Sequence, residues 1–337
     1  MKVLFHAEQL NYRGTTNSIL EYARYNQEIL GNESVIVYSR ESPIGLDVGS
    51  DQHVIDAVSK QFELLTYNDN DHLNRIAENY DFFYSQRAGE KVDSHTKREN
   101  AIITSTKMGV HCVFQWHDPH GDVYAYISEW MSKNVAKLYE APVHPWVPYI
   151  VDLPPPNYDV RTHLGISKDK FVIGRFGGYQ TFDLPFAHKV VTKVAQERDD
   201  IVFFFANTQP FCNLPNVIFM GPFLGQEQKS NYINACDAFI HARWLGESFG
   251  LAIAESLFFN KPVLACDVGF DRNHVETLKP FDLLYKENDE EDLYNRIVSL
   301  RHKVGIDYRK LAVEKYNPKN VMNQFKQVFF DATSTNT

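Results

Sequence analysis

Apolar and polar positions alternate along this chain in a way that predicts strands and helices in turn. Residues 3–6 form a short apolar run, a polar loop and an amphipathic helix ending near Leu30 follow, and residues 34–38 form the next apolar run. A strand, a helix and a second strand in this order predict a parallel sheet, so an α/β fold is expected. The first half continues with expected helices at residues 54–65, 72–79 and 124–139, expected strands at 81–84 and 111–116, and an extended segment at 143–151.

A proline-rich stretch, residues 153–157, separates this series from a second one and predicts a semi-rigid linker between two domains. The length of 337 residues also favours two domains, since a single core rarely grows so large. We place the domains at residues 1–152 and 153–317. Two doubly wound, Rossmann-like domains would face a cleft at the carboxyl ends of their strands, where ligands of such folds bind. In the second series, the expected strands are 171–176, 201–206, 217–220, 238–242 and 262–266, and the expected helices are 182–198, 226–236, 251–259 and most of 290–332.

The helix expected near residues 251–259 carries the most informative pattern of the chain. It is apolar around most of its circumference, yet it contains one carboxylate, Glu255, seven positions after Ser248. Ser248 is suited to cap this helix and Asn260 to end it in a left-handed conformation, and the free N–H groups of the first turn would attract an anion. Together with Glu247, this face could hold a ligand that has an anionic centre and hydroxyl groups on either side. The alternative is a core helix whose Glu255 pairs with a buried basic residue.

Two glycine-containing loops add candidate binding residues. Arg175 and Gly178 follow the first strand of the second domain, where glycine lets the backbone approach a ligand and arginine can bind a phosphate through a fork of two hydrogen bonds. Gly14 and Thr15 follow the first strand of the chain and could offer N–H groups to an anion. Each loop also has an ordinary interpretation, a glycine turn with a surface arginine in one and a helix N-cap in the other.

His117 opens the segment His117-Asp118-Pro119-His120-Gly121-Asp122 after an expected strand. It could be a polar residue of a catalytic cleft, or it could ligate a metal together with His120, Asp118 and Asp122, although no recognised ligand spacing supports the metal. His120 could also bond within its own turn. The chain contains no Gly-x-Ser-x-Gly elbow and no Walker lysine loop, which disfavours acyl transfer and P-loop chemistry.

Composition narrows the possible partners. The formal net charge of −9 and the dispersed basic residues disfavour a nucleic-acid partner. No apolar run approaches the roughly 20 residues of a membrane helix, and the apolar part of the N-terminus is too short for a signal peptide, so only peripheral membrane contact is left open. The four cysteines lie far apart in apolar surroundings and predict reduced thiols of a cytoplasmic protein.

At this point the motifs resemble a known family. Glu247-Ser248-Phe249-Gly250 followed by Glu255 resembles the Glu-x7-Glu signature of retaining GT-B glycosyltransferases of the family-4 type. Asn260-Lys261-Pro262-Val263-Leu264-Ala265 is similar to the Gly-x-Pro-Val-Val-Ala segment of that family, with Asn260 in place of glycine. The resemblance extends over about residues 145–330; the first half matches only through residues 13–15 and His117.

The resemblance implies a GT-B fold in which a C-terminal helix, about residues 318–332, packs back on the first domain. It implies transfer of a sugar from a nucleoside-diphosphate sugar to a saccharide or lipid-linked acceptor, with retention at the anomeric carbon and with no metal or other cofactor. By the same resemblance, Glu247 would contact the hydroxyls of the sugar, Glu255 would bind the ribose, and the N–H groups around Ser248, Phe249, Gly250 and Leu251 would hold the diphosphate. Arg175 would stabilise the leaving diphosphate, with Gly178 and Gln180 beside it. In the first domain, Gly14 and Thr15 would approach the phosphates, and His117 would lie near the sugar.

One departure concerns the phosphate clamp. Gln180 stands where the family normally has a lysine, and a clamp with one cation fewer stabilises a leaving diphosphate less. Arg272, in the loop after residues 262–266, is a possible substitute. Alternatives that remain open are a GT-B-shaped sugar-nucleotide epimerase, a non-catalytic nucleotide-sugar-binding protein, and a metal hydrolase built on His117 and His120.

Overall fold

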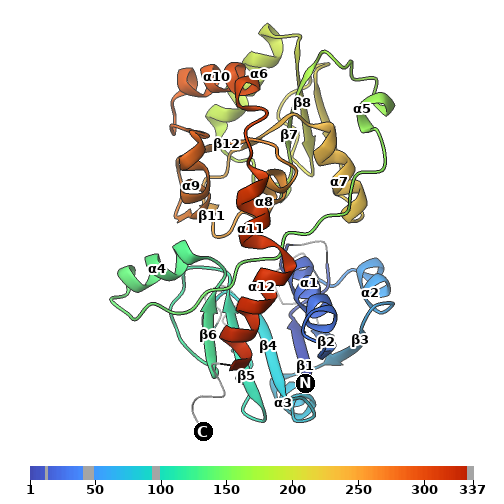
Figure 1. The fold of residues 1–337 in the computed structure, drawn as a ribbon, viewed down its shortest axis with the longest axis vertical. Coiled ribbons are helices and arrows are strands. Elements are labelled where there is room, and N and C mark those ends of the chain that lie inside the picture. Colours follow the sequence, from blue (N-terminus) through green and yellow to red (C-terminus); the bar gives the residue numbers. More distant parts are fainter. Residues whose placement is uncertain (12–13, 41–48, 93–98, 332–337) are drawn as a thin grey trace. The chain divides into compact units, whose positions relative to one another are not determined.

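The computed structural model describes residues 1–11, 14–40, 49–92 and 99–331, and the chain divides into two compact units (Figure 1). The first unit comprises Met1–Ile150 and Tyr316–Thr337, and the second comprises Val151–Lys315. Within the described residues, each unit contains one six-stranded sheet, and every strand pair in both sheets is parallel. The expected α/β class is confirmed.

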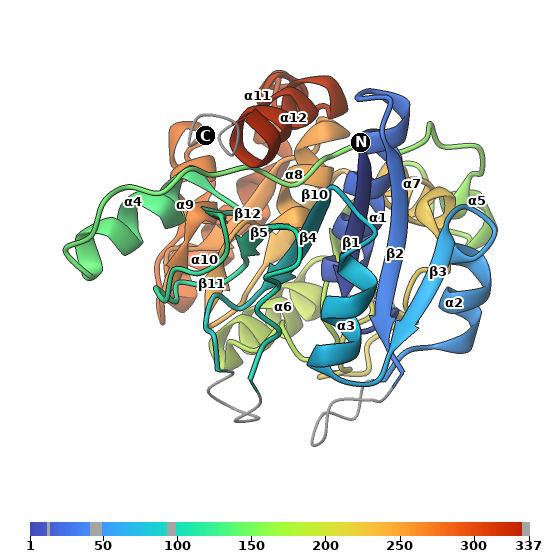
Figure 2. The same ribbon diagram turned by 90° about the horizontal axis from the view of Figure 1, so that it is seen from below.

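The first unit is built around β1, whose side chains are covered on both faces of the sheet. Val3, Leu4 and Phe5 are fully buried, as is typical of a central parallel strand. The strand order β3-β2-β1-β4-β5-β6 reverses direction between β1 and β4, which makes the sheet doubly wound (Figure 2). Its elements are β1 (Lys2–Ala7), α1 (Gly14–Glu28), β2 (Glu33–Ser39), α2 (Gln52–Val58), β3 (Glu63–Tyr67), α3 (Asn70–Ala77), β4 (Phe82–Arg87), β5 (Lys107–Cys112), β6 (Val123–Tyr126) and α4 (Glu129–Leu138).

The C-terminal segment completes the core of this unit. Helix α12 (Pro318–Phe325) begins at Asn317, whose side chain accepts the N–H of Asn320, and continues as the π-helix η3 (Lys326–Asp331). The ring of Phe325 stacks on Tyr22 of α1 at 5.0 Å and lies 5.1 Å from Tyr84 of β4. Aromatic side chains from two distant parts of the sequence therefore close the same core.

Two expected helices are wrong in part. Residues 54–65 divide into the end of α2 and the strand β3, and residues 124–139 divide into the strand β6 and the helix α4. The strand β3 is half-buried over most of its length and β6 is buried at all four of its residues, so neither alternates between a buried and an exposed face. Their alternating pattern is weak for that reason. The true start of α4 is fixed by Ser128, whose hydroxyl accepts the N–H of Met131 at 3.2 Å.

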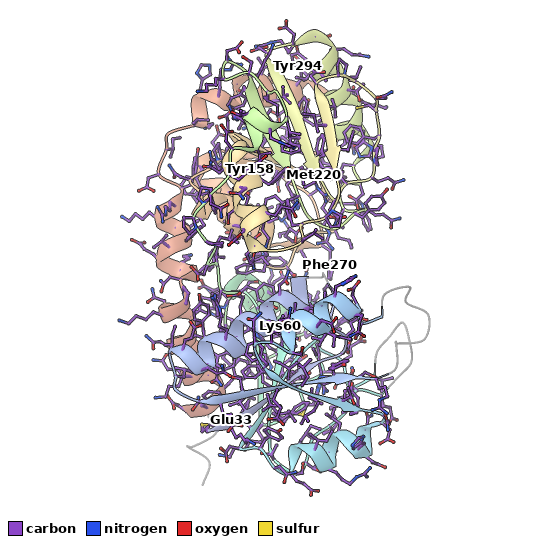
Figure 3. All side chains as sticks on the ribbon, turned by 90° about the vertical axis from the view of Figure 1, so that its right-hand side faces the viewer. Glu33, Lys60, Tyr158, Met220, Phe270 and Tyr294 are labelled. Carbon is purple, nitrogen blue, oxygen red and sulfur yellow. The ribbon has the colours of Figure 1, made fainter. Side chains whose placement is uncertain are left out.

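The second unit is also doubly wound, with the order β14-β12-β10-β7-β8-β9. Phe270, in the loop after β12, and Tyr294, on α10, lie at opposite ends of this unit (Figure 3). The loop of Phe270 marks the carboxyl end of the strands, where the candidate site lies. The elements are α5 (Val160–His163), β7 (Phe171–Arg175), α6 (Pro185–Glu197), β8 (Ile201–Ala206), β9 (Val217–Met220), α7 (Gln226–Ala235), β10 (Ala238–His241), β11 (Gly246–Glu247), α8 (Leu251–Phe258), β12 (Val263–Cys266), β13 (Asp271–Arg272), α9 (Asn273–Leu278), η1 (Lys279–Phe281), β14 (Leu284–Tyr285), α10 (Glu290–Ser299), η2 (Leu300–Lys303) and α11 (Arg309–Tyr316).

No helix among the described residues is long and apolar enough to cross a membrane.

Candidate functional site

The loop between β10 and α8 carries the carboxylate of Glu247. Within this loop, β11 pairs in parallel with β13, and Gly246 lies opposite Asp271. Gly246 has a φ of 71°, and a side-chain carbon there would collide with the carbonyl oxygen of Asp271. Because only glycine fits this backbone, the short pairing fixes the position of Glu247.

The Glu247 carboxylate is bound on both oxygens by basic side chains. Its Oε1 lies 2.8 Å from His241 Nε2, and its Oε2 lies 3.2 Å from Arg243 Nη1. Burial opposes its ionisation, but the hydrogen bond from His241 and the charge of Arg243 outweigh burial and lower the pKa of Glu247 to about 2. With 20% of its side chain exposed, Glu247 is therefore an ionised acceptor for hydroxyl groups at neutral pH.

A buried histidine supports the backbone of Glu247. His274 Nε2 lies 3.0 Å from the carbonyl oxygen of Cys266, which can only accept, so the proton is on Nε2. The bare Nδ1 then accepts the N–H of Glu247 at 3.3 Å. Burial, with a further contribution from the charge of His241, lowers the pKa of His274 to about 4. The neutral form that this arrangement needs is thus the stable one.

Helix α8 starts at Leu251, as expected, but its N-cap is a different residue from the one the sequence suggests. The expectation that Ser248 caps it is wrong, because the N-cap is Gly250, in a left-handed conformation with a φ of 86° and no side-chain cap. The chain can turn into the helix only after this glycine, and the carbonyl of Phe249 is held instead by Asn273 Nδ2 at 2.7 Å. The N–H groups of the first turn, beginning at Leu251, are therefore not taken by a capping side chain. The left-handed Asn260 expected beyond the helix is confirmed by its φ of 59°.

Glu255 lies on the second turn of α8 and has a buried basic partner. Its Oε1 accepts a hydrogen bond from Lys229 Nζ of α7 at 2.7 Å, and the two side chains are 6% and 11% exposed. The structural pair that the sequence left open as an alternative is therefore present. The role of Glu255 toward a ribose stays a prediction.

Arg175 is buried at the end of β7, and its terminal nitrogens are already engaged. Nη1 donates to the carbonyl of Asn207 at 3.0 Å and to Thr208 Oγ1 at 2.7 Å. Nη2 donates to the carbonyl of Gly178 at 2.9 Å and to Thr181 Oγ1 at 2.6 Å. Burial lowers the pKa of Arg175 to about 10, so the side chain stays charged at neutral pH. In this conformation its charge orders the glycine loop rather than presenting a free fork to a phosphate.

The glycine loop and the Glu247 loop are joined through Asp183. The N–H of Asp183 donates to the carbonyl of Ala242 at 2.9 Å, and its Oδ1 accepts the N–H of Trp244 at 2.6 Å. Residues 177–180 of the glycine loop, which include Gly178 and Gln180, are exposed. The structure therefore brings Arg175, Gly178 and Gln180 into one region with Glu247.

Two arginines of this region are candidates for a second cation, and each of them already has an acidic partner. Arg272 pairs with Asp267. Arg243 pairs with Glu247 at 3.2 Å, 26% of its side chain is exposed, and its charge is one of the causes that lower the pKa of Arg175. Arg243 is therefore the candidate whose charge acts on Arg175.

The candidate residues of the first unit lie in the loops after its strands. Gly14 and Thr15 are exposed at the start of α1, whereas Arg13, quoted with them, lies outside the described residues. An added Cβ at Gly14 would meet no atom within 4 Å, so no described contact requires glycine there. His117 is half-buried, and its ring lies 5.2 Å from that of His144.

The metal alternative has little support in the described parts of the chain. The Nδ1 of His120 lies 2.7 Å from the carbonyl oxygen of Asp118, within its own turn. Asp118 forms an ion pair with Lys91 at 3.0 Å. Among the described residues, no group of three or more His, Cys, Asp or Glu side chains is arranged to hold a metal ion.

Sequence reasoning missed the residues that hold the two glutamates. His241 and Arg243 precede Glu247 by six and four positions, a spacing that could have been noticed along the loop. His274 and Lys229 approach from 27 and 26 positions away, and no local pattern indicates such contacts.

Comparisons with known structures define the class of fold. A glycosyltransferase from Rickettsia africae ESF-5 is similar over 100% of this chain and 99% of its own, at 14% identity and a TM-score of 0.73. Anabaena Alr3699/HepE, in complex with UDP-glucose, is similar over 99% of this chain and 100% of its own, at 14% identity and a TM-score of 0.72. A putative UDP-N-acetylglucosamine 2-epimerase from Listeria monocytogenes is similar over 98% and 97%, at 11% identity and a TM-score of 0.60. The fold is therefore that of the GT-B glycosyltransferases, as expected.

The sequence comparison points the same way for the second unit. Residues 170–303 match the family described as glycosyl transferases group 1. No curated protein matches the chain. The family match and the fold together support a GT-B glycosyltransferase.

Proposed function

We propose that this protein transfers a sugar from a nucleoside-diphosphate sugar to a saccharide or lipid-linked acceptor in the cytoplasm, with retention at the anomeric carbon and without a metal. The observation that carries the proposal is the ionised Glu247 carboxylate, fixed by His241 and Arg243 beside the open first turn of α8. The family match over residues 170–303, which includes this segment, supports it.

The donor site follows from the order of chemical groups along this segment. Glu247 would accept hydrogen bonds from hydroxyls of the transferred sugar. The N–H groups of Phe249, Gly250 and Leu251 would bind the diphosphate, because the start of a helix favours negative charge. Glu255, four residues into the helix, would meet the ribose about 6 Å further along, given a rise of roughly 1.5 Å per residue.

The charge that develops on the leaving diphosphate needs cations close by. Arg175 supplies one, and we assign the second to Arg243 because Gln180 is neutral. Preorganised charges in a site with little water stabilise such a leaving group without having to reorganise. Arg175 would exchange some of its bonds to the glycine loop for bonds to phosphate, which couples donor binding to the order of that loop.

Two experiments test the proposal. Thermal-shift measurements with a panel of nucleoside diphosphates should show a saturable rise in Tm for at least one base, because a ligand that binds only the native state stabilises it. Incubation of the corresponding nucleotide sugars with an acceptor panel should then give a product whose anomeric configuration, read by NMR, matches the donor.

Other outcomes would redirect the assignment. Conversion of the sugar nucleotide to its epimer in the absence of acceptor would favour the epimerase. The putative epimerase from Listeria monocytogenes has a fold similar to that of this chain. Nucleotide binding with no turnover of any donor across the acceptor panel would favour the non-catalytic binding protein. A product of inverted configuration would overturn the retaining mechanism.

A further inference from the structure

Arg87, the last residue of β4, is the most poorly satisfied charged group in the described part of the first unit. Its side chain is 3% exposed, and its Nε donates to Ser85 Oγ at 2.9 Å. Its two terminal nitrogens, Nη1 and Nη2, are buried and have no hydrogen-bond partner among the described residues. Four N–H groups of a cation thus point into the interior without an acceptor.

This arrangement costs stability. Burial lowers the pKa of Arg87 to about 10, so the guanidinium is still charged at neutral pH. Glu8 is the acidic residue whose charge acts on it, and Tyr67 and Cys112 contribute less. A buried charge without hydrogen-bond partners is unfavourable, and an apolar side chain of the same size would serve packing better. Packing alone therefore does not account for arginine at this position.

Other side chains of the first unit contribute a buried polar atom without a partner and further positive charge. The Nδ1 of His120 carries its proton, because it faces the carbonyl of Asp118, and its Nε2 is buried without a partner. Burial lowers the pKa of both His120 and His6, and the charge of Arg87 is a smaller cause in each case. Lys91 acts on His120 in the same direction.

A hydrogen bond to Ser85 fixes the orientation of the Arg87 side chain. Ser85 Oγ accepts the Nε–H of Arg87 and also lies 2.9 Å from His6 Nδ1. The other ring nitrogen of His6, Nε2, lies 2.9 Å from the hydroxyl of Tyr67. Tyr67 and Ala88 are only half-buried, so the guanidinium lies one layer beneath the surface.

Arg87 lies at the carboxyl end of β4, at the point where the strand order of the sheet reverses. The strand order reverses between β1, which carries His6, and β4, which carries Arg87. On the other side, Arg87 lies opposite Cys112, the last residue of β5. Open parallel sheets bind ligands outside the carboxyl ends of their strands at such a switch point.

We propose that Arg87 binds an oxyanion, a carboxylate or a phosphate, through a two-pronged contact from Nη1 and Nη2. Assigning the anion to the acceptor, as a uronate or a sugar phosphate, rests on the proposed function. Anion binding by Arg87 does not depend on that function.

Thermal shift on the full chain tests the binding. Glucuronate, glucose 6-phosphate and inorganic phosphate are the probes, and neutral glucose is the control ligand. We expect a saturable rise in Tm with at least one anion and none with glucose; the anion that saturates at the lowest concentration identifies the source. Arg87→Met should abolish this rise, while Arg75→Met, at an exposed arginine of α3, should preserve it.

A structural role predicts the opposite pattern. If Arg87→Met lowers the Tm of the ligand-free protein and leaves the anion-dependent rise intact, or if no anion shifts the wild type, the proposal is overturned. We expect the ligand-free Tm to be unchanged or higher in Arg87→Met. In both variants the shift caused by a nucleoside diphosphate should persist, so a failure here is distinguishable from a failure of the donor site.

Turnover gives a second readout once the donor is known. Arg87→Met should raise KM for an anionic acceptor by about 10- to 100-fold, the range for losing hydrogen bonds to a charged group. KM for a neutral acceptor should stay within about twofold, because that acceptor makes no charge-assisted contact. An equal effect on both acceptors would contradict the assignment to the acceptor.

Discussion

Lys229 and Glu255 form an ion pair of 2.7 Å between helices α7 and α8, and both side chains are almost completely covered. Because each charge satisfies the other, the pair fixes α8 against α7 at the turn that follows the candidate diphosphate site. Removing one partner leaves the other charge buried and unpaired, whereas replacing both with apolar side chains leaves no buried charge behind.

We therefore expect Lys229→Met to lower the free energy of unfolding by about 3–5 kcal/mol, the cost of an uncompensated buried charge. The double variant with Met at both positions should recover most of that loss. Urea unfolding of the wild type, the two single variants and the double variant measures the coupling. Lys229→Met with wild-type stability would show that Glu255 finds water or another partner.

Glu247 should matter for turnover far more than for nucleotide affinity, because the proposed function assigns it to the sugar and not to the base. We expect Glu247→Ala to lower kcat by about 100-fold or more while the Kd of the nucleoside diphosphate changes by less than about threefold. Glu276→Gln, at an exposed position on α9, is the matched control and should change neither value. Equal losses of turnover and affinity would remove Glu247 from the sugar subsite.

Arg243 and Gln180 offer a test by exchange. If Arg243 supplies the second cation, Arg243→Gln should weaken binding of a nucleoside diphosphate by about tenfold, as expected for a lost charge-assisted contact of roughly 1.5 kcal/mol, and should affect the nucleoside less. Adding Gln180→Lys to this variant should restore part of the affinity, and Gln180→Lys alone should not weaken binding. Isothermal titration with the diphosphate and the nucleoside reads both effects. If Arg243→Gln binds the diphosphate as tightly as the wild type does, Arg243 does not supply the second cation.

The sequence predicted the parts of this architecture that depend on local pattern. Buried runs such as that of β1 stand out because a central parallel strand is covered on both faces. The edge strands β3 and β6 were read as helix because β3 is evenly half-buried over most of its length and β6 is evenly buried, which leaves neither with an alternating pattern. The α/β class and the GT-B fold could thus be predicted, but the boundaries at the sheet edges could not.

The candidate site likewise combines residues that the local sequence indicated with residues that it did not. Glu247 and Glu255 became candidates through their spacing along one segment, but Lys229 and His274 reach them from other elements. Likewise, the loop position of Arg175 was readable, whereas its bonds to Asn207 and Thr208 arise only when β7 and β8 pair. The resemblance to a family could not supply these contacts either, since it carried roles for motif positions alone.

Buried histidines should make stability depend on pH below neutrality. Burial lowers the pKa of His6 to about 3 and those of His111 and His274 to about 4, from 6.5 in the unfolded chain. The unfolded state therefore takes up protons first as pH falls, so stability is full above about pH 6.5 and is lost toward pH 4, by roughly 2 kcal/mol per histidine between pH 7 and 5. Urea midpoints measured from pH 8 to pH 5 should show this decline, and His111→Gln, which can keep the bonds of His111 to Tyr84 and Val147, should flatten it. A midpoint independent of pH in this window would contradict the buried neutral state.

Gly246 and Gly165 allow backbone strain to be separated from steric collision. Their φ values are 71° and 66°, so alanine meets a similar left-handed penalty of about 1–2 kcal/mol at both positions. At Gly165 an added Cβ meets nothing within 4 Å, whereas at Gly246 it strikes the carbonyl of Asp271 and must push β11 away from β13. We expect Gly165→Ala to lower the free energy of unfolding by that penalty alone and to keep full turnover. Gly246→Ala should lose more stability and should also lose turnover, because the displaced strand carries Glu247. If the two variants are equally stable and equally active, the β11–β13 pairing does not position the carboxylate, and the geometry of the proposed sugar subsite must be set elsewhere in the loop.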